Sequence, residues 1–208
     1  MYKRQLYDSQ REKEQEIEQL RIENLQSRCE ALANQVNPHF FFNSLNGISS
    51  LIRKGNDDNA LLYVTKLSDI FRYILQSDGQ SIVPLREELA FIRSFMHVLE
   101  VRFEGKLTCS IEVPEKDNER MLPVLSLLPL VENITVHNRI DSDHRMNIRI
   151  RMNGDELELS NPVYPKQTPP DTHGIGLQNL RNRFELMMDK QIRVETDGET
   201  FSVYLTLR

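Results

Sequence analysis

The sequence predicts an α+β protein in which a helical hairpin precedes an α/β sandwich. The first 36 of its 208 residues contain no proline or glycine and are rich in Glu, Gln, Lys and Arg, which favours one long helix. The C-terminal half instead alternates apolar and polar residues, as half-buried strands do. An Asn-Gly pair at 153–154 and an Asp-Gly pair at 197–198 interrupt that alternation, and both are typical hairpin turns.

The N-terminal helix carries a narrow apolar seam whose spacings alternate between three and four residues. Its members are Ile22, Leu25, Cys29, Leu32 and Val36, and the next step of three falls on His39. So narrow a seam needs a second helix to cover it, and a parallel homodimer is the expected source. The alternative is a solvated helix that docks on its own domain.

A second helix is predicted to fold back on the first and complete a hairpin. Pro38 predicts a kink in the first helix, because a proline there removes one backbone hydrogen bond. After turn residues 54–57, the second helix is expected over about 56–75. Its broad apolar face consists of Leu61, Leu62, Val64, Leu67, Ile70, Phe71 and Ile74. Two such hairpins form a four-helix bundle in a dimer, and we place this dimerisation domain at residues 1–80.

The second domain, residues 81–208, is predicted to interleave helices with antiparallel strand pairs, so that helices cover one face of a sheet. Helices are expected at about 86–103, 122–137 and 177–188. Strands are expected at 107–113, 146–152, 156–160, 192–195 and 201–207. Residues 161–170 hold four prolines and predict a flexible flap.

Composition excludes several classes of function. A net charge of −5 gives no electrostatic footprint for direct nucleic-acid binding. No run of about 18 apolar residues is present, so no segment of this sequence is predicted to span a membrane. Cys29 and Cys109 lie far apart in unlike contexts, and two free thiols in a reducing cytosol are the simplest account.

Residues 37–46 form the most unusual segment, Asn-Pro-His-Phe-Phe-Phe-Asn-Ser-Leu-Asn. By itself it favours a packed histidine, because a run of Phe is usually core and short motifs have many false positives. Asn43 lies four residues after His39, one helical turn along the chain.

Polar residues also interrupt the apolar helix predicted at 122–137. Glu132, Asn133 and His137 need partners if that helix is buried. Asn133 and His137 lie one turn apart on the same face. A ligand pocket explains the three residues, and an internally satisfied hydrogen-bond network explains them equally well.

A glycine-rich stretch follows the predicted flap. Gly174 and Gly176 allow close backbone approach, and a helix that opens at Leu177 offers unpaired N–H groups to an anion. Arg181 and Arg183 add positive charge nearby. The alternative is an ordinary glycine turn before a helix.

Taken together and in this order, these segments resemble the LytS-like family of bacterial sensor histidine kinases from about residue 32 onward. The family's phosphoacceptor segment, Gln-Ile-Asn-Pro-His-Phe-Leu-Phe-Asn-Ser-Leu-Asn, is similar to residues 35–46. Its N box, Pro-Leu-Val-Glu-Asn-Ala-Ile-Lys-His, resembles residues 129–137, and its last glycine box, Gly-x-Gly-Leu-x-Asn-x-x-x-Arg-Leu, fits residues 174–184. The resemblance implies a Bergerat-type ATP-binding sandwich of the histidine-kinase type for the second domain.

The resemblance also implies roles for individual residues. His39 would be the nucleophile that attacks the γ-phosphorus of ATP, and we expect Asn43 to position its ring. Asn133 would hold Mg²⁺. The remaining nucleotide contacts would come from the N box, from the last glycine box and from the residue that follows the strand at 156–160. They are Glu132, His137, Asn161, Gly174, Gly176, Leu177, Asn179 and Arg183. Phosphoryl transfer depends mainly on positioning and charge neutralisation, which such a site supplies.

Three departures from the family's pattern bear on activity. The family's first glycine box supplies an Asp that accepts the adenine amino group, whereas this chain has Asn161-Pro162, and a neutral amide is a weaker acceptor. In the N box, Ile134 replaces the usual Ala and Val136 replaces the usual Lys. Asn138 replaces a glycine, which we expect to matter little.

Three hypotheses of function therefore stand. The first is a sensor histidine kinase of a bacterial two-component system that autophosphorylates His39 and passes the phosphoryl group to a response regulator. The second is a degenerate kinase that binds nucleotide or a response regulator without phosphoryl transfer. The third is an ATPase of the chaperone or mismatch-repair type. The resemblance implies a homodimer at the cytoplasmic side of the inner membrane, attached through a segment N-terminal to this chain.

Overall fold

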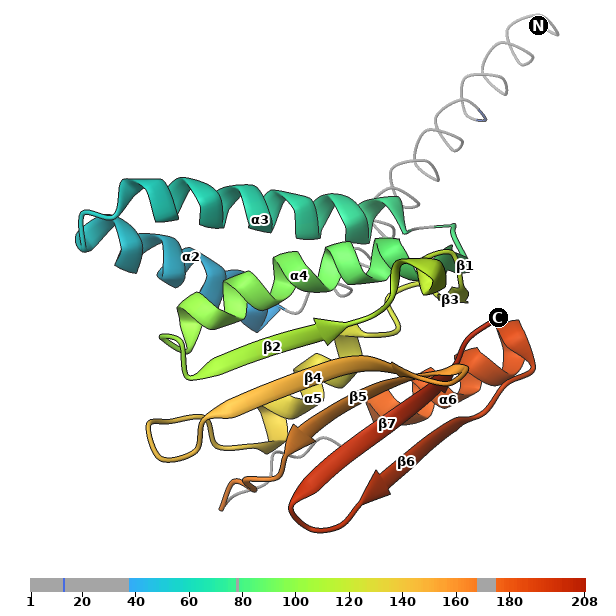
Figure 1. The fold of residues 1–208 in the computed structure, drawn as a ribbon. Coiled ribbons are helices and arrows are strands. Elements are labelled where there is room, and N and C mark those ends of the chain that lie inside the picture. Colours follow the sequence, from blue (N-terminus) through green and yellow to red (C-terminus); the bar gives the residue numbers. More distant parts are fainter. Residues whose placement is uncertain (1–12, 14–37, 78, 168–174) are drawn as a thin grey trace, which may run out of the picture. The chain divides into compact units, whose positions relative to one another are not determined.

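A computed structural model describes residues 13, 38–77, 79–167 and 175–208 (Figure 1). The described elements are, in chain order, α2 Pro38–Arg53, α3 Asp57–Gln76, β1 Ile82–Pro84, α4 Leu85–Arg102, β2 Leu107–Glu112, the 3₁₀ helix η1 Glu115–Asp117, β3 Met121–Pro123, α5 Leu128–His137, β4 Met146–Asn153, β5 Glu156–Pro162, α6 Ile175–Met188, β6 Ile192–Thr196 and β7 Thr200–Thr206. The chain divides into two compact units between Asn43 and Ser44. The seam from Ile22 to Val36 lies outside the described residues, so the predicted dimer helix stays a prediction, as does the kink at Pro38.

The second helix of the predicted hairpin is present as α3. It follows a turn in which Gly55 adopts a left-handed φ of 67° and the Asn56 amide donates to the carbonyl of Leu51. Its buried side chains recur every three or four residues, at Ala60, Tyr63, Leu67, Ile70 and Ile74. Leu61, Leu62 and Val64 of the predicted apolar face are exposed in the single chain, because the buried residues in line with Tyr63 face inward. The role of that face in a dimer stays a prediction.

Helix α3 also packs along α4 within the second unit. The rings of Tyr73 and Phe91 stack with their centroids 4.8 Å apart. The division of the chain into domains at residue 80 stays a prediction.

A five-stranded sheet in the order β2-β4-β5-β7-β6 forms the centre of the second unit. Both predicted hairpins are confirmed, with Asn153 paired to Glu156 at one turn and Gly198 at a φ of 92° in the other. One pairing was not predicted: β2 runs parallel to β4. Parallel neighbours need a long crossover, and here it contains β3 and α5.

The two faces of the sheet differ in character. Met146, Ile148 and Ile150 are buried and alternate with exposed residues along β4. Helices α5 and α6 lie on one face, behind the sheet in Figure 1. The fold class is therefore confirmed as α+β, with a sheet covered by helices on one side.

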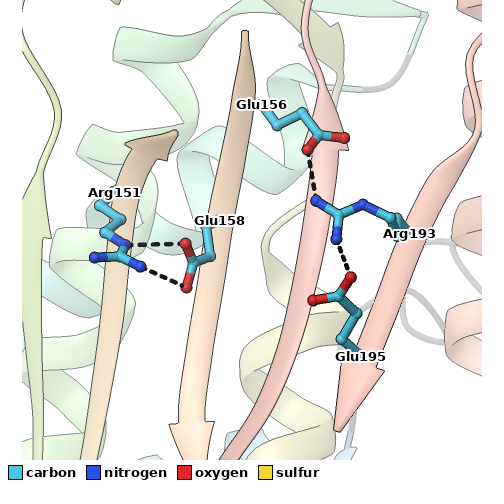
Figure 2. A network of polar contacts seen from close by, with 5 residues as sticks. All are labelled: Arg151, Glu156, Glu158, Arg193 and Glu195. Carbon is cyan, nitrogen blue, oxygen red and sulfur yellow. Dashed lines mark hydrogen bonds and ion pairs between the residues drawn. The ribbon is translucent and has the colours of Figure 1, made fainter. Parts of the chain in front are cut away.

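The opposite face carries charged pairs (Figure 2). The guanidinium of Arg151 donates to both carboxylate oxygens of Glu158, at 2.9 and 3.3 Å. Arg193 bridges Glu156 and Glu195, and its guanidinium carbon lies 3.7 Å from the centroid of the Tyr204 ring. Arg151 and Glu158 lie on the neighbouring strands β4 and β5, whereas Arg193 of β6 binds Glu195 on its own strand and reaches Glu156 of β5 across β7. The charges on this face are thus paired with one another.

Two predicted boundaries were wrong. The helix expected from residue 122 begins at Leu128, because Leu122 pairs with Val83 of β1 in a small antiparallel sheet and Leu125 adopts a φ of 56°. The segment expected to be a flap from residue 161 begins inside β5, which continues to Pro162. The rest of that segment, from residue 168 on, lies outside the described residues.

Candidate active site

His39 belongs to helix α2, as the phosphoacceptor prediction requires, but its side chain lies outside what the structure describes. Asn43, one turn later on the same helix, is half-buried, and its side-chain nitrogen has no hydrogen-bond partner among the described residues. A donor in that condition is available to a neighbouring group. The positioning role of Asn43 stays a prediction.

Helix α5 separates its apolar and polar residues onto two faces. Leu130, Val131 and Ile134 are buried. Glu132 and Asn133 are half-buried and His137 is exposed, so the expectation of a fully buried helix was wrong. The polar face borders solvent, an arrangement that suits a ligand site better than a closed internal network does.

The polar face of α5 meets the start of α6 at Gly176. A Cβ placed on Gly176 would lie 3.6 Å from Oδ1 of Asn133 and 3.8 Å from Cβ of Pro129. Two motifs far apart in sequence are thus brought together at Asn133 and Gly176. Leu177 is half-buried and Asn179 is exposed on the same helix, whereas Gly174 lies outside the described residues.

Asn161 is buried at the end of β5, with 3% of its surface exposed. Its side-chain nitrogen donates to the carbonyl of Pro162 at 2.6 Å. Its side-chain oxygen is also buried and has no hydrogen-bond partner among the described residues. A buried acceptor without a partner costs about 1–3 kcal/mol, so a ligand that brings an N–H donor to Asn161 would recover that energy.

Arg183 is half-buried on α6, and its guanidinium donates to the backbone carbonyl of Val124. Burial lowers the pKa of Arg183, while the nearby carboxylate of Glu88 raises it. Arg183 was predicted to contact nucleotide. In the structure its guanidinium binds the loop that precedes α5.

Asn138 stands where the family has a glycine, and we expected this replacement to matter little. In the structure the Asn138 side chain makes two hydrogen bonds. Its side-chain nitrogen donates to the carbonyl of Ile134 at 3.1 Å, and its side-chain oxygen accepts the amide N–H of Tyr164 at 2.7 Å. Sequence reasoning missed Lys166, which donates from Nζ to the carbonyl of Thr135 at 2.9 Å. No pattern marks a lysine in a proline-rich segment as part of a site. Its ammonium lies at the last turn of α5, where Val136 replaces the family's lysine.

Among the described residues, no three His, Cys, Asp or Glu side chains converge in a way that would hold a metal ion. The described helices are also too short or too polar to cross a bilayer.

Comparisons with known proteins place the chain in a family. Residues 27–107 match the family described as Histidine kinase. The chain is 30% identical over 189 residues to "Sensor histidine kinase BtsS" of Escherichia coli (strain K12), covering 88% of this chain and 33% of that protein. It is 33% identical over 196 residues to "Sensor histidine kinase/phosphatase LytS" of Staphylococcus aureus (strain N315), covering 84% and 33%.

Among solved structures, the Acinetobacter baumannii histidine kinase AdeS is similar with a TM-score of 0.42 at 14% identity, over 79% of this chain and 93% of that one. The chain spans about a third of the length of the curated relatives it matches. The sequence relationships are the decisive ones, and by them the chain belongs to the LytS-like family of sensor histidine kinases.

Proposed function

We propose that this chain is the catalytic part of a sensor histidine kinase, which uses ATP and Mg²⁺ to phosphorylate His39 and then passes the phosphoryl group to a response regulator. The observation that carries the proposal is the meeting of Asn133 with Gly176, at the junction of α5 and α6. An amide oxygen beside an open glycine backbone at a helix start suits a Mg²⁺-phosphate group. Mg²⁺ keeps most of its ligands from phosphate and water, so one protein ligand is sufficient.

Asn161 supports adenine as the base. Its unpartnered, buried side-chain oxygen is an acceptor for the exocyclic amino group of adenine. Lys166 supports phosphate binding, because its ammonium supplies at the end of α5 the positive charge that Val136 lacks. The nucleotide site would then combine Asn133, Asn161, Gly176 and Lys166, with Glu132, His137, Leu177 and Asn179 at its rim.

The reaction itself needs little covalent chemistry from the protein. The lone pair of a neutral imidazole nitrogen of His39 forms a bond to the γ-phosphorus, and the bond from that phosphorus to the bridging oxygen breaks, so ADP leaves with the electron pair. A histidine is suitable because it is largely neutral near pH 7. The side-chain oxygen of Asn43 would accept the N–H of the other ring nitrogen and so hold the imidazole in the orientation for attack.

Homodimerisation is part of the proposal. Among the described residues of the hairpin, six large apolar side chains are exposed in the single chain: Leu45, Ile52, Leu61, Leu62, Val64 and Leu75. An apolar surface of this kind on two adjoining helices favours a second copy as its cover. Because the relatives are about three times longer, attachment to the cytoplasmic side of the inner membrane is proposed for the whole protein.

One observation favours the second candidate, a degenerate kinase. The side-chain nitrogen of Asn161 already donates to the Pro162 carbonyl. Its side-chain oxygen, as part of a neutral amide, is a weaker acceptor than the family's carboxylate. Such a chain would bind nucleotide or a response regulator without phosphoryl transfer.

The test is to incubate the purified chain with γ-labelled Mg-ATP beside a His39→Gln variant. We expect acid-labile label on the wild type and none on the variant. Label on neither protein, together with measurable Mg-ATP affinity, would replace the kinase with the degenerate binding module. Steady ATP turnover that survives His39→Gln would instead favour the third hypothesis, an ATPase.

A further inference from the structure

Glu88, in α4, is a fully buried carboxylate that connects three separate segments of the second unit. Its Oε1 accepts the hydroxyl of Tyr73, in α3, at 2.7 Å and the amide N–H of Leu125 at 2.6 Å. Its Oε2 accepts the amide N–H of Leu127 at 3.1 Å. Neither Glu88 nor Tyr73 belongs to any motif of the sequence analysis.

The loop bound by Glu88, residues 123–127, leads directly into α5. Leu125 adopts a φ of 56° there, a conformation that a leucine keeps only when its surroundings impose it. On the other side of the same loop, Arg183 of α6 donates to the carbonyl of Val124. The loop is thus held from α4 and from α6, the helix that carries Gly176.

Two titratable groups interact with Glu88: Tyr73 through a hydrogen bond and Arg183 through its charge. Burial raises the pKa of Glu88, whereas the hydrogen bonds from Tyr73 and from the loop amides lower it. Burial also raises the pKa of Tyr73, and the adjacent Glu88 raises it further. The Tyr73 hydroxyl therefore remains protonated and stays a donor to Glu88.

Removal of the Tyr73 hydroxyl would break its hydrogen bond to Glu88 and leave the ring in place. The Tyr73 ring is held independently by stacking on Phe91, so loss of its hydroxyl would leave the apolar packing of α3 on α4 intact. Glu88 would then lose one of its three hydrogen-bond donors. Its carboxylate would be less firmly positioned, and so would the loop whose amides it binds. A buried polar group that loses a partner keeps its desolvation cost without compensation, which is enough to loosen a strained loop.

We propose that Glu88 is a positioning residue of the nucleotide site, which sets the start of α5 through the amides of Leu125 and Leu127, and that Tyr73 makes this position depend on helix α3. The nucleotide part of this proposal rests on the proposed function. Its consequence is that a movement of α3, the second helix of the hairpin, would reach Asn133 through one side-chain hydrogen bond and one loop.

The first test measures amide hydrogen exchange in the nucleotide-free chain carrying Tyr73→Phe. We expect exchange at Leu125 and Leu127 to become about tenfold faster, which corresponds to the loss of one net hydrogen bond, while β4 and β5 keep their protection. Tyr204→Phe is the matched control, because it removes the same hydroxyl from a ring on the opposite face of the sheet. Equal exchange at the loop in wild type and Tyr73→Phe would overturn the proposal.

The Glu88→Gln variant tests the two carboxylate oxygens of Glu88 separately. An amide oxygen in place of Oε1 can still accept from Tyr73 and Leu125, but an amide nitrogen in place of Oε2 would oppose the N–H of Leu127. We therefore expect faster exchange at Leu127 than at Leu125. A uniform increase over the whole unit would indicate general destabilisation and would contradict a positioning role.

The second test measures the dissociation constant for Mg-ATP well below the unfolding temperature, where every variant is folded and a loss of stability cannot change affinity. Tyr73→Phe should raise the constant by about threefold to tenfold and Tyr204→Phe by less than about twofold, as expected for a lost hydrogen bond that acts at the site. Unchanged affinity with faster loop exchange would remove the nucleotide part of the proposal. Absence of binding by the wild type would overturn the proposed function, and the exchange result would still decide whether Glu88 couples α3 to α5.

Discussion

Gly47 of α2 passes so close to Tyr63 of α3 that a Cβ on Gly47 would lie 2.5 Å from the Tyr63 hydroxyl oxygen and 2.8 Å from the ring carbon that bears it. Tyr63 is fully buried, so its ring has little room to move aside. The hairpin therefore depends on the absence of a side chain at one position.

Gly47→Ala should lower the free energy of unfolding by about 1–3 kcal/mol, because overpacking outweighs the gain in helix propensity. Urea unfolding measures it. Tyr63→Phe removes the nearer clashing atom and should recover part of the loss in the double variant. A Gly47→Ala variant that is more stable than the wild type would show that α2 and α3 can move apart at this contact without loss of stability.

Asn133→Asp should abolish measurable Mg-ATP binding without unfolding the chain. Asn133 is half-buried on the polar face of α5, so the fold tolerates the change, whereas a new carboxylate beside the phosphates repels them. Titration calorimetry and circular dichroism measure both effects. Asn182→Asp, an exposed change of the same type on α6, is the control, and unchanged affinity in Asn133→Asp would remove Asn133 from the site.

Asn161→Asp should both restore the family's acceptor and destabilise the chain. The new carboxylate would face the Pro162 carbonyl, which now accepts from the amide at 2.6 Å, so its ionised form is disfavoured in the fold. A carboxyl pKa raised by folding means that stability falls as pH rises above the ordinary Asp range of about 4 and recovers below it. Thermal unfolding between pH 4 and pH 8 tests this dependence, with Asn161→Ala as the control that lacks a titrating group. A variant whose stability loss is independent of pH would contradict the contact with Pro162.

Leu61→Ser should weaken the homodimer. Leu61 is 70% exposed on α3, so the substitution costs the single chain little and removes apolar contact from the proposed dimer surface. Sedimentation equilibrium measures the change. Leu186→Ser on α6, which is 85% exposed, is the matched control and should leave the mass distribution unchanged. Equal dimerisation in wild type and Leu61→Ser would exclude this part of α3 from the interface.

Cys109 should react slowly with iodoacetamide. Burial, with the nearby charge of Glu100, raises the pKa of its thiol to about 12, so at neutral pH the native chain holds roughly a thousandfold less thiolate than an exposed cysteine does. A Cys29→Ser background isolates the signal. We expect the rate to rise tenfold per pH unit from pH 7 to 10 and to increase sharply in urea. Equal rates in the native and unfolded chains would show that Cys109 is accessible.

The sequence by itself determined the features that depend on neighbours along the chain. Local patterns of residue type identified α3, α4 and α6 to within two residues at each end, and the Asn-Gly and Asp-Gly pairs located both hairpin turns. Residue type likewise indicated the polar face of α5 and the glycine start of α6, because both depend on spacing within one helix.

Only the tertiary structure decided which distant segments meet. It paired β1 with β3, which moved the start of α5 to Leu128, and it laid β2 parallel to β4. It also placed Asn133 beside Gly176 and gave Glu88 its partners on α3 and on the loop before α5. No local pattern carries this information, because a buried carboxylate is stabilised by donors far away in sequence, and those donors reach it only when the chain is folded.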